Sequence, residues 1–188
     1  MFTGIIEKKA KILDIQGSRF VVENLFGDEL QVGQSVAHDG GCMTLESIKD
    51  SQYSFFVMQE SFEKLNFHEK RIGDYFNIER CLRANDRIDG HFVSGHIDTT
   101  GKISFSEIRD DTSLVLGISF AKEFSKYTIE KGSIALNGVS LTIVETREGY
   151  ISVSLIPLTQ DWTNLGAAKI GDAINIEFDM LGKYILNK

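Results

Sequence analysis

Short runs of apolar residues alternate with polar positions along most of the chain. Residues 19–23, 53–58 and 75–79 are rich in β-branched and aromatic side chains, which is typical of half-buried strands. Glycine, aspartate and asparagine separate these runs, and the sequence contains 17 glycines but one proline, as expected for strands joined by tight turns. The pattern therefore predicts an all-β fold, with short strands that close into small barrels because closure removes exposed sheet edges.

The pattern occurs twice along the chain. Residues 35–45 and 133–143 align at an offset of 98, with Ser, Ala, Gly and Thr unchanged at matching positions. The offset stays at 98 through the strands that follow and is 91 near the start of each copy. Two copies of this length indicate a duplicated domain rather than a solenoid. Because Cys42 in the first copy aligns with Ser140 in the second, we expect two related pockets that differ in reactivity.

A few helical segments should interrupt the strands. The two offsets differ by seven residues, so the second copy carries an insertion, and residues 121–127 are predicted to form it as a short helix. Each copy should have a further helical turn before its last strand, near 62–67 and 161–168. The tail has apolar residues at helical spacing, and a short helix there needs another subunit to cover its apolar face.

The repeat divides the chain into two domains and a tail. The polar segment 83–87 follows the last strand of the first copy, and this is where we expect the join. We predict an N-terminal domain at residues 1–86, a C-terminal domain at 87–178 and an oligomerisation helix at 179–188.

Composition and charge exclude several functions. The net charge of −7 and the pI near 5.1 argue against nucleic-acid binding and against electrostatic attachment to a membrane. No apolar run approaches the roughly 18 residues of a membrane span, and residues 1–7 lack the basic segment of a signal peptide, so we expect a cytoplasmic protein. Cys42 and Cys81 lack Cys-x-x-Cys spacing and the four histidines are scattered, so neither a disulfide nor a metal site is expected.

Five motifs resemble those of the riboflavin synthase α chains, a family built from lumazine-binding domains. They lie at residues 1–7, 35–44, 90–96, 138–142 and 155–157, in the order of the family, and they span nearly the whole chain. The resemblance implies two similar six-stranded Greek-key barrels from an internal duplication, and a short C-terminal helix that gathers three chains. It further implies a homotrimer whose active site lies between the first barrel of one subunit and the second barrel of its neighbour.

The reaction that this resemblance implies is a dismutation of two molecules of 6,7-dimethyl-8-ribityllumazine. One molecule transfers a four-carbon unit to the other, which yields riboflavin and 5-amino-6-(D-ribitylamino)uracil without a cofactor or metal. Because both reactants are the same compound, two related pockets can hold one each, and well-oriented pairs gain up to roughly 7–11 kcal/mol. The alternative is a non-catalytic lumazine- or flavin-binding protein of the same family. Association with lumazine synthase is left open.

The strongest candidates for chemistry are Cys42 and His96. A thiolate is a good nucleophile, and Cys42 can add transiently to the electrophilic carbon of the acceptor lumazine. Histidine can carry a proton near neutral pH, which suits His96. Outside this family, Cys42 would be interpreted as a small buried residue, His96 as a surface residue and Asp179 as a helix N-cap. The expected catalytic residues are Cys42, His96, Ser140, Ser35 and Asp179.

Further residues resemble the family's ligand contacts. Phe2 can stack on the bound heterocycle, and Glu60 and Lys131 suit the ribityl hydroxyls or the pyrimidine edge. His91 is interpreted as structural, and Leu158 stands where many relatives have a polar residue, which leaves the second pocket with one polar contact fewer. The expected substrate-binding residues are Phe2, Gly4, Ile5, Ile6, Met43, Thr44, Phe56, Met58, Glu60, Ser61, Gly95, Ile97, Lys131, Leu141, Thr142, Ile156, Pro157 and Thr159.

Overall fold

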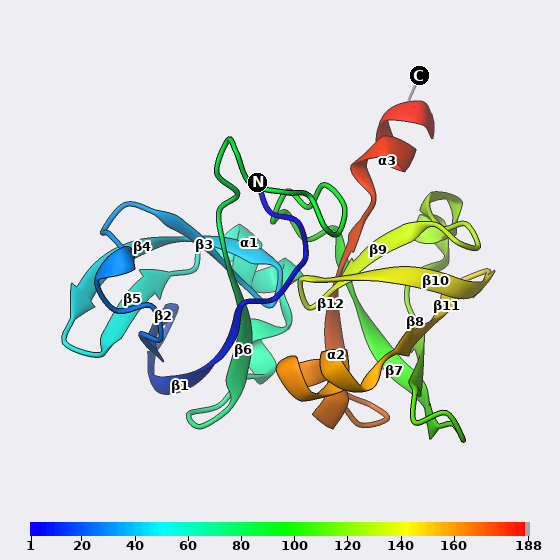
Figure 1. Cartoon of the computed structure of the whole chain (residues 1–188), viewed down its shortest axis with the longest axis horizontal. Coiled ribbons are helices and arrows are strands. Elements are labelled where there is room, and N and C mark those ends of the chain that lie inside the picture. Colours follow the sequence, from blue (N-terminus) through cyan, green and yellow to red (C-terminus); the bar gives the residue numbers. More distant parts are fainter. Residues whose placement is uncertain (187–188) are drawn as a thin grey trace.

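Two closed antiparallel barrels of six strands each form the body of the molecule (Figure 1), in a computed structural model that describes residues 1–186. The strands of the first barrel are β1 (Lys8–Gln16), β2 (Arg19–Glu23), β3 (Ser35–His38), β4 (Gly41–Lys49), β5 (Gln52–Phe56) and β6 (Tyr75–Arg80). Those of the second are β7 (Thr99–Ile108), β8 (Leu114–Ser119), β9 (Ser133–Leu136), β10 (Val139–Arg147), β11 (Tyr150–Leu155) and β12 (Ala173–Phe178). The predicted all-β fold of two six-stranded barrels is confirmed.

The two barrels share one topology. Their strands follow the circular orders β1-β2-β5-β4-β3-β6 and β10-β11-β8-β7-β12-β9, which coincide when six is added to each number of the first. The strand register is also the same in both barrels. Ala37 pairs with Cys42 between β3 and β4, and their equivalents Ala135 and Ser140 pair between β9 and β10. Residues that are 98 positions apart in these strands therefore occupy equivalent positions in the two barrels.

Helices fill the gaps between strands. They are η1 (Gly27–Glu29), α1 (Gln59–Lys64), η2 (Asn66–Glu69), η3 (Lys122–Tyr127), α2 (Pro157–Trp162), η4 (Asn164–Ala167) and α3 (Met180–Leu186). The insertion predicted at 121–127 is the 3₁₀ helix η3. The helical turns before the last strands begin earlier than predicted, and α2 starts at its proline because a proline ring suits the first turn of a helix. Figure 1 shows α3 projecting away from both barrels, and the last two residues of the predicted tail helix lie outside the described residues.

The two cores differ in chemistry. Four phenylalanines pack together in the first barrel, at positions 20, 55, 67 and 76, whereas the second core is mainly aliphatic. His38 is fully buried among these rings, where its Nε2 lies 2.8 Å from the Tyr53 hydroxyl and its Nδ1 lies 3.1 Å from the Val36 carbonyl. A carbonyl only accepts, so Nδ1 carries the proton and Nε2 accepts from Tyr53. Burial lowers the pKa of His38 to about 3, so the ring is neutral at physiological pH.

The barrels meet across an approximate twofold axis. Phe2 and Val93, which are equivalent residues at the offset of 91, exchange two backbone hydrogen bonds of 2.7 and 3.1 Å with each other. Together with Ala37 and Ala135 they form a small apolar cluster between the barrels. Because equivalent residues contact each other, the two halves are related by a rotation rather than stacked in a row.

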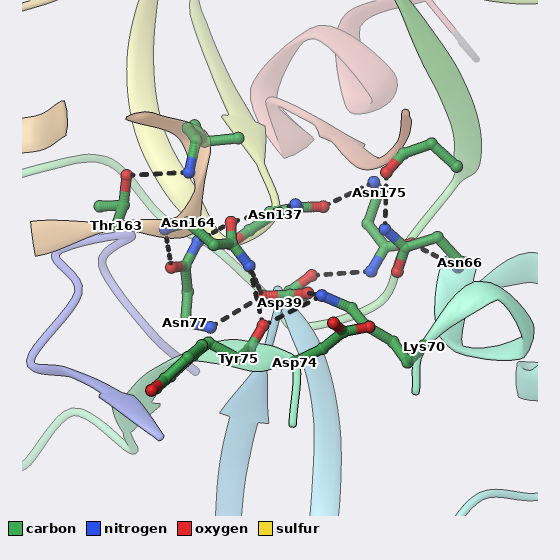
Figure 2. A network of polar contacts seen from close by, with 12 residues as sticks. Asp39, Asn66, Lys70, Asp74, Tyr75, Asn77, Asn137, Thr163, Asn164 and Asn175 are labelled. Carbon is green, nitrogen blue, oxygen red and sulfur yellow. Dashed lines mark hydrogen bonds and ion pairs between the residues drawn. The ribbon is translucent and has the colours of Figure 1, made fainter. Parts of the chain in front are cut away.

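An amide network also joins the two barrels (Figure 2). Asn77 donates from its backbone to Asp39 Oδ1 at 2.8 Å, and the equivalent Asn175 donates to Asn137 Oδ1 at 2.9 Å. The side chains then cross, since Asn77 Nδ2 donates to the Asn137 carbonyl and Asn175 Nδ2 donates to the Asp39 carbonyl. Lys70 breaks the symmetry with an ion pair of 2.5 Å to Asp39 Oδ2. The network fixes how the barrels sit against each other, and hence where residues of one half meet the other.

Candidate active site

The segment that leads into each barrel packs on the other barrel. Gly4 accepts a hydrogen bond of 2.8 Å from the Ser140 amide on β10, and the equivalent Gly95 accepts one of 2.8 Å from the Cys42 amide on β4. Ile6 accordingly belongs to the core of the second barrel. Each half therefore supplies part of the surface around the other half's reactive residue.

Buried carboxylates hold these lead-in segments in place. Glu79 accepts from the Thr3 amide at 2.7 Å, the Thr3 hydroxyl at 2.9 Å and the Gly4 amide at 2.9 Å. Its equivalent, Glu177, accepts from the amide and hydroxyl of Ser94 and from the amide of Gly95 in the same way. Burial raises the pKa of Glu79 to about 7 and also raises that of Glu177, while the hydrogen bonds lower both.

Glycine is required at the crossing points. Gly95 has a φ of +84°, and a Cβ added there would lie 2.6 Å from the Cβ of Cys42. Gly4 has a φ of +77°, and an added Cβ would lie 2.6 Å from the Cβ of Ser140. Only a residue without a side chain combines this backbone conformation with so close an approach.

A cavity of about 280 Å³ opens beside Cys42. Its walls come from the start of β4, from α1 and from the lead-in segment of the second barrel, and its lining residues are Gly41, Cys42, Met43, Met58, Glu60, Ser61, Lys64, Leu65, Gly95, His96 and Ile97. Eight residues predicted for the site from sequence thus surround one cavity, with a thiol and an imidazole on its wall.

Cys42 is half-buried on this wall. Burial raises the pKa of its thiol, and a hydrogen bond with the Ser35 side chain on the neighbouring strand acts in the opposite direction. The resting cysteine is therefore protonated near neutral pH, and its sulfur becomes a nucleophile only when a base takes the proton.

The equivalent position in the second barrel has a different chemistry. Ser140 Oγ lies 2.7 Å from Nδ1 of His91, which comes from the loop between the barrels. Burial lowers the pKa of His91, and the negative charge of Asp179 raises it. From sequence, His91 was interpreted as structural, and its position in the Gly-His-Phe-Val-Ser-Gly-His motif was the one signal for this contact.

Several predicted residues lie elsewhere. Phe2 is fully buried between the barrels, so its ring faces protein rather than an open pocket. Asp179 caps α3 by accepting from the Leu181 amide at 3.0 Å, although its charge also acts on His91. Lys131 is exposed and has a φ of +66° where the first copy has Gly33. Thr44, Phe56 and Thr142 are exposed on strands, and Ile156 and Pro157 lie at the start of α2.

Two segments of the chain match one family of known proteins. The family described as lumazine binding domain matches residues 3–81 and 94–179, so each match contains one lead-in segment and one barrel. The chain belongs to the lumazine binding domain family. A curated riboflavin synthase of Actinobacillus pleuropneumoniae is 42% identical, covering 98% of this chain and 88% of that protein. Those of Escherichia coli K12 and Mycobacterium tuberculosis H37Rv are 36% and 33% identical, covering 95% and 98% of this chain and 87% and 96% of theirs.

Solved structures of LumP share the fold. LumP complexed with riboflavin superimposes with a TM-score of 0.88 at 21% identity, covering 95% of this chain and 99% of LumP. LumP complexed with 6,7-dimethyl-8-(1'-D-ribityl) lumazine gives a TM-score of 0.85 at 21% identity, covering 94% and 98%. Within residues 1–186, no three His, Cys, Asp or Glu side chains are placed to share a metal ion, and no helix is long and apolar enough to cross a membrane.

Proposed function

We propose that the chain catalyses the riboflavin synthase reaction, in which two molecules of 6,7-dimethyl-8-ribityllumazine give riboflavin and 5-amino-6-(D-ribitylamino)uracil. Curated riboflavin synthases at 33–42% identity over nearly the whole chain support an enzyme of this transferase class. The observation that carries the proposal is the pair of equivalent sites with different reactive groups, Cys42 in one and Ser140 with His91 in the other. Two molecules of one compound with different fates need such a pair.

The roles follow from the contacts. In the first site, Cys42 adds through its sulfur to an electrophilic ring carbon, and His96 on the same cavity wall exchanges protons with the substrate. Ser35, which hydrogen-bonds Cys42, positions the thiol. In the second site, the Ser140 hydroxyl is oriented by His91, and Asp179 favours the protonated form of that histidine. The division at 1–86, 87–178 and 179–188 is part of the proposal and is supported by the two repeated barrels.

The first test is turnover with the lumazine alone. Purified protein should form riboflavin at half the rate at which the lumazine disappears, measured by absorbance and chromatography. Cys42→Ala should lower kcat by about two orders of magnitude, the lower end of what a positioned group contributes, with a smaller change in lumazine binding. Cys81→Ala, at the exposed cysteine, is the matched control and should keep its rate. Tight binding without turnover in the unmodified protein would instead support a non-catalytic binder.

The proposal extends to assembly. The described part of α3 carries Leu181, Tyr184 and Ile185 at 59%, 72% and 71% exposure, and an apolar helix of this length needs a cover. We therefore propose that the protein is a cytoplasmic homotrimer whose active site is shared between subunits. Association of this trimer with lumazine synthase is left open.

Deletion of residues 180–188 should give monomers in sedimentation and little activity in turnover assays. Lys183→Ala, which removes the ion pair of 2.6 Å to Asp98 and keeps the apolar face, is the control. Full activity in a truncated monomer would contradict the shared site.

A further inference from the structure

The two pockets have helices of the same length at their edges. Helix α1 spans Gln59–Lys64 and helix α2 spans Pro157–Trp162, at the offset of 98 throughout. Lys64 is the last residue of α1, and it lines the cavity of the first site. Trp162 therefore occupies the equivalent edge of the second site.

The chemistry of the two edges is opposite. In the first site, Glu60 and Lys64 form an ion pair of 3.1 Å along α1, with both side chains exposed. In the second site, these positions are Leu158 and Trp162, which are 53% and 59% exposed. Ile156 in place of Met58 is also exposed, and Ile5 in place of His96 is 46% exposed. The first-site equivalents of these four residues all line the cavity beside Cys42. By this equivalence, four large exposed apolar side chains surround the second site, and such a surface indicates that a ligand covers it.

Trp162 stands on a fixed backbone. Lys9 Nζ, from β1 of the first barrel, donates to the Asp161 carbonyl at 2.7 Å. Gln160 Nε2 donates to the Leu155 carbonyl at 3.0 Å and to the Thr112 carbonyl at 2.9 Å, which fastens α2 to the second barrel on the other side. An exposed indole on this fixed backbone can stack on a flat ring with little loss of conformational entropy, because the side chain has only two rotatable bonds.

We propose that Trp162 is a specificity-determining residue that stacks on the fused ring of the molecule bound in the second site. The inference rests on the proposed function and adds to it a difference between the two sites. The second site holds its ligand mainly by ring stacking and apolar contact, whereas the first offers a carboxylate and an ammonium group to the polar parts of its ligand. The two sites thus differ in how each recognises the same compound.

Riboflavin binding to the intact protein tests this inference. Calorimetry in a Cys81→Ala background should resolve two classes of site, and the class at Cys42 is identified by protection of that thiol from iodoacetamide. Trp162→Lys, which copies the first site, should weaken the other class about tenfold, within the range measured for loss of base–aromatic stacking. Trp162→Phe should keep most of the affinity because a flat ring remains. Protection of Cys42 should be the same in both variants, and Lys64→Ala should change only the protected class.

Three results would overturn the inference: equal affinities in Trp162→Lys and the parent, equal losses in Trp162→Phe and Trp162→Lys, or dissociation of the assembly by Trp162→Lys in sedimentation. The last result would mean that the indole covers a subunit contact instead of a ligand. Absence of any riboflavin binding in the parent protein would count against the proposed function itself, and the two failures are therefore distinguishable.

Discussion

Replacing Lys70 with alanine would leave a buried carboxylate without its cation. Asp39 is fully buried, its Oδ1 accepts from the Asn77 amide and from Asn164 Nδ2, and its Oδ2 has Lys70 Nζ at 2.5 Å and no hydrogen bond within the described residues. Removing one partner of a buried ion pair costs about 3–5 kcal/mol, because the other charge stays desolvated. We expect Lys70→Ala to lower the free energy of unfolding by this amount.

The second half of the chain suggests the compensating change. Asp39 and Lys70 are equivalent to Asn137 and Ala168, where the same fold is held by neutral groups. Asp39→Asn alone should cost about 1–2 kcal/mol, since Lys70 can turn its ammonium group to solvent. The double variant should lie within about 1–2 kcal/mol of the parent, because replacing a buried pair with uncharged groups is often nearly neutral.

Urea unfolding at pH 7 of the parent, Lys70→Ala, Asp39→Asn and the double variant measures the coupling free energy between Asp39 and Lys70. Lys64→Ala is the matched control, because its ion pair with Glu60 is exposed and should contribute no more than about 0.5 kcal/mol. Lys70→Met keeps the apolar stem and separates loss of charge from loss of packing. Additive losses in the double variant, or a loss below about 1 kcal/mol in Lys70→Ala, would refute the reasoning.

Two further predictions concern acid stability and close packing. Since the pKa of His38 is lowered to about 3 by burial, the histidine stabilises the fold above its unfolded value of about 6.5, and this contribution is lost as pH falls toward 3. His38→Leu with Tyr53→Phe should flatten the dependence of urea stability on pH in this window, and an unchanged slope would contradict the assignment. Gly95→Ala should lower both stability and turnover because its Cβ would meet Cys42, whereas Gly17→Ala, with a φ of +60° and open space, should cost only about 1 kcal/mol in unfolding free energy; equal effects would contradict the clash.

The barrels could be predicted because alternation is a local signal and the repeat is visible when the two halves of the sequence are aligned. The offset of 98 is visible in Ser35 to Leu45 and is matched in the strand register, so the duplicated domain could be inferred without coordinates. The predicted helix boundaries near Phe62 and Asp161 were less accurate. Those helices are only six residues long, so the sequence there has no strong helical periodicity from which to read their ends. Alternation also shows which face of a strand is buried but not which barrel buries it.

The contacts between halves were beyond this kind of prediction. Phe2 was expected to stack on the bound heterocycle because the family's first residues approach it, and in the structure Phe2 packs against Val93 on the twofold axis. His91 was interpreted as structural, and its contact with Ser140 depends on the path of the loop between the barrels. Both outcomes are set by how residues about 50 to 90 positions apart meet in space, which no local pattern encodes.

The exchanged lead-in segments explain why the duplicated halves remain one unit. The wall of the first cavity includes Gly95, His96 and Ile97, which come from the second half of the chain. The surface beside Ser140 includes Gly4, which comes from the first half. A barrel separated from its partner would therefore lose one wall of its pocket, and the second barrel would also lose Ile6 from its core. The same exchange lets the two pockets diverge, because a change such as His96 for Ile5 alters one site without touching the core that supports it.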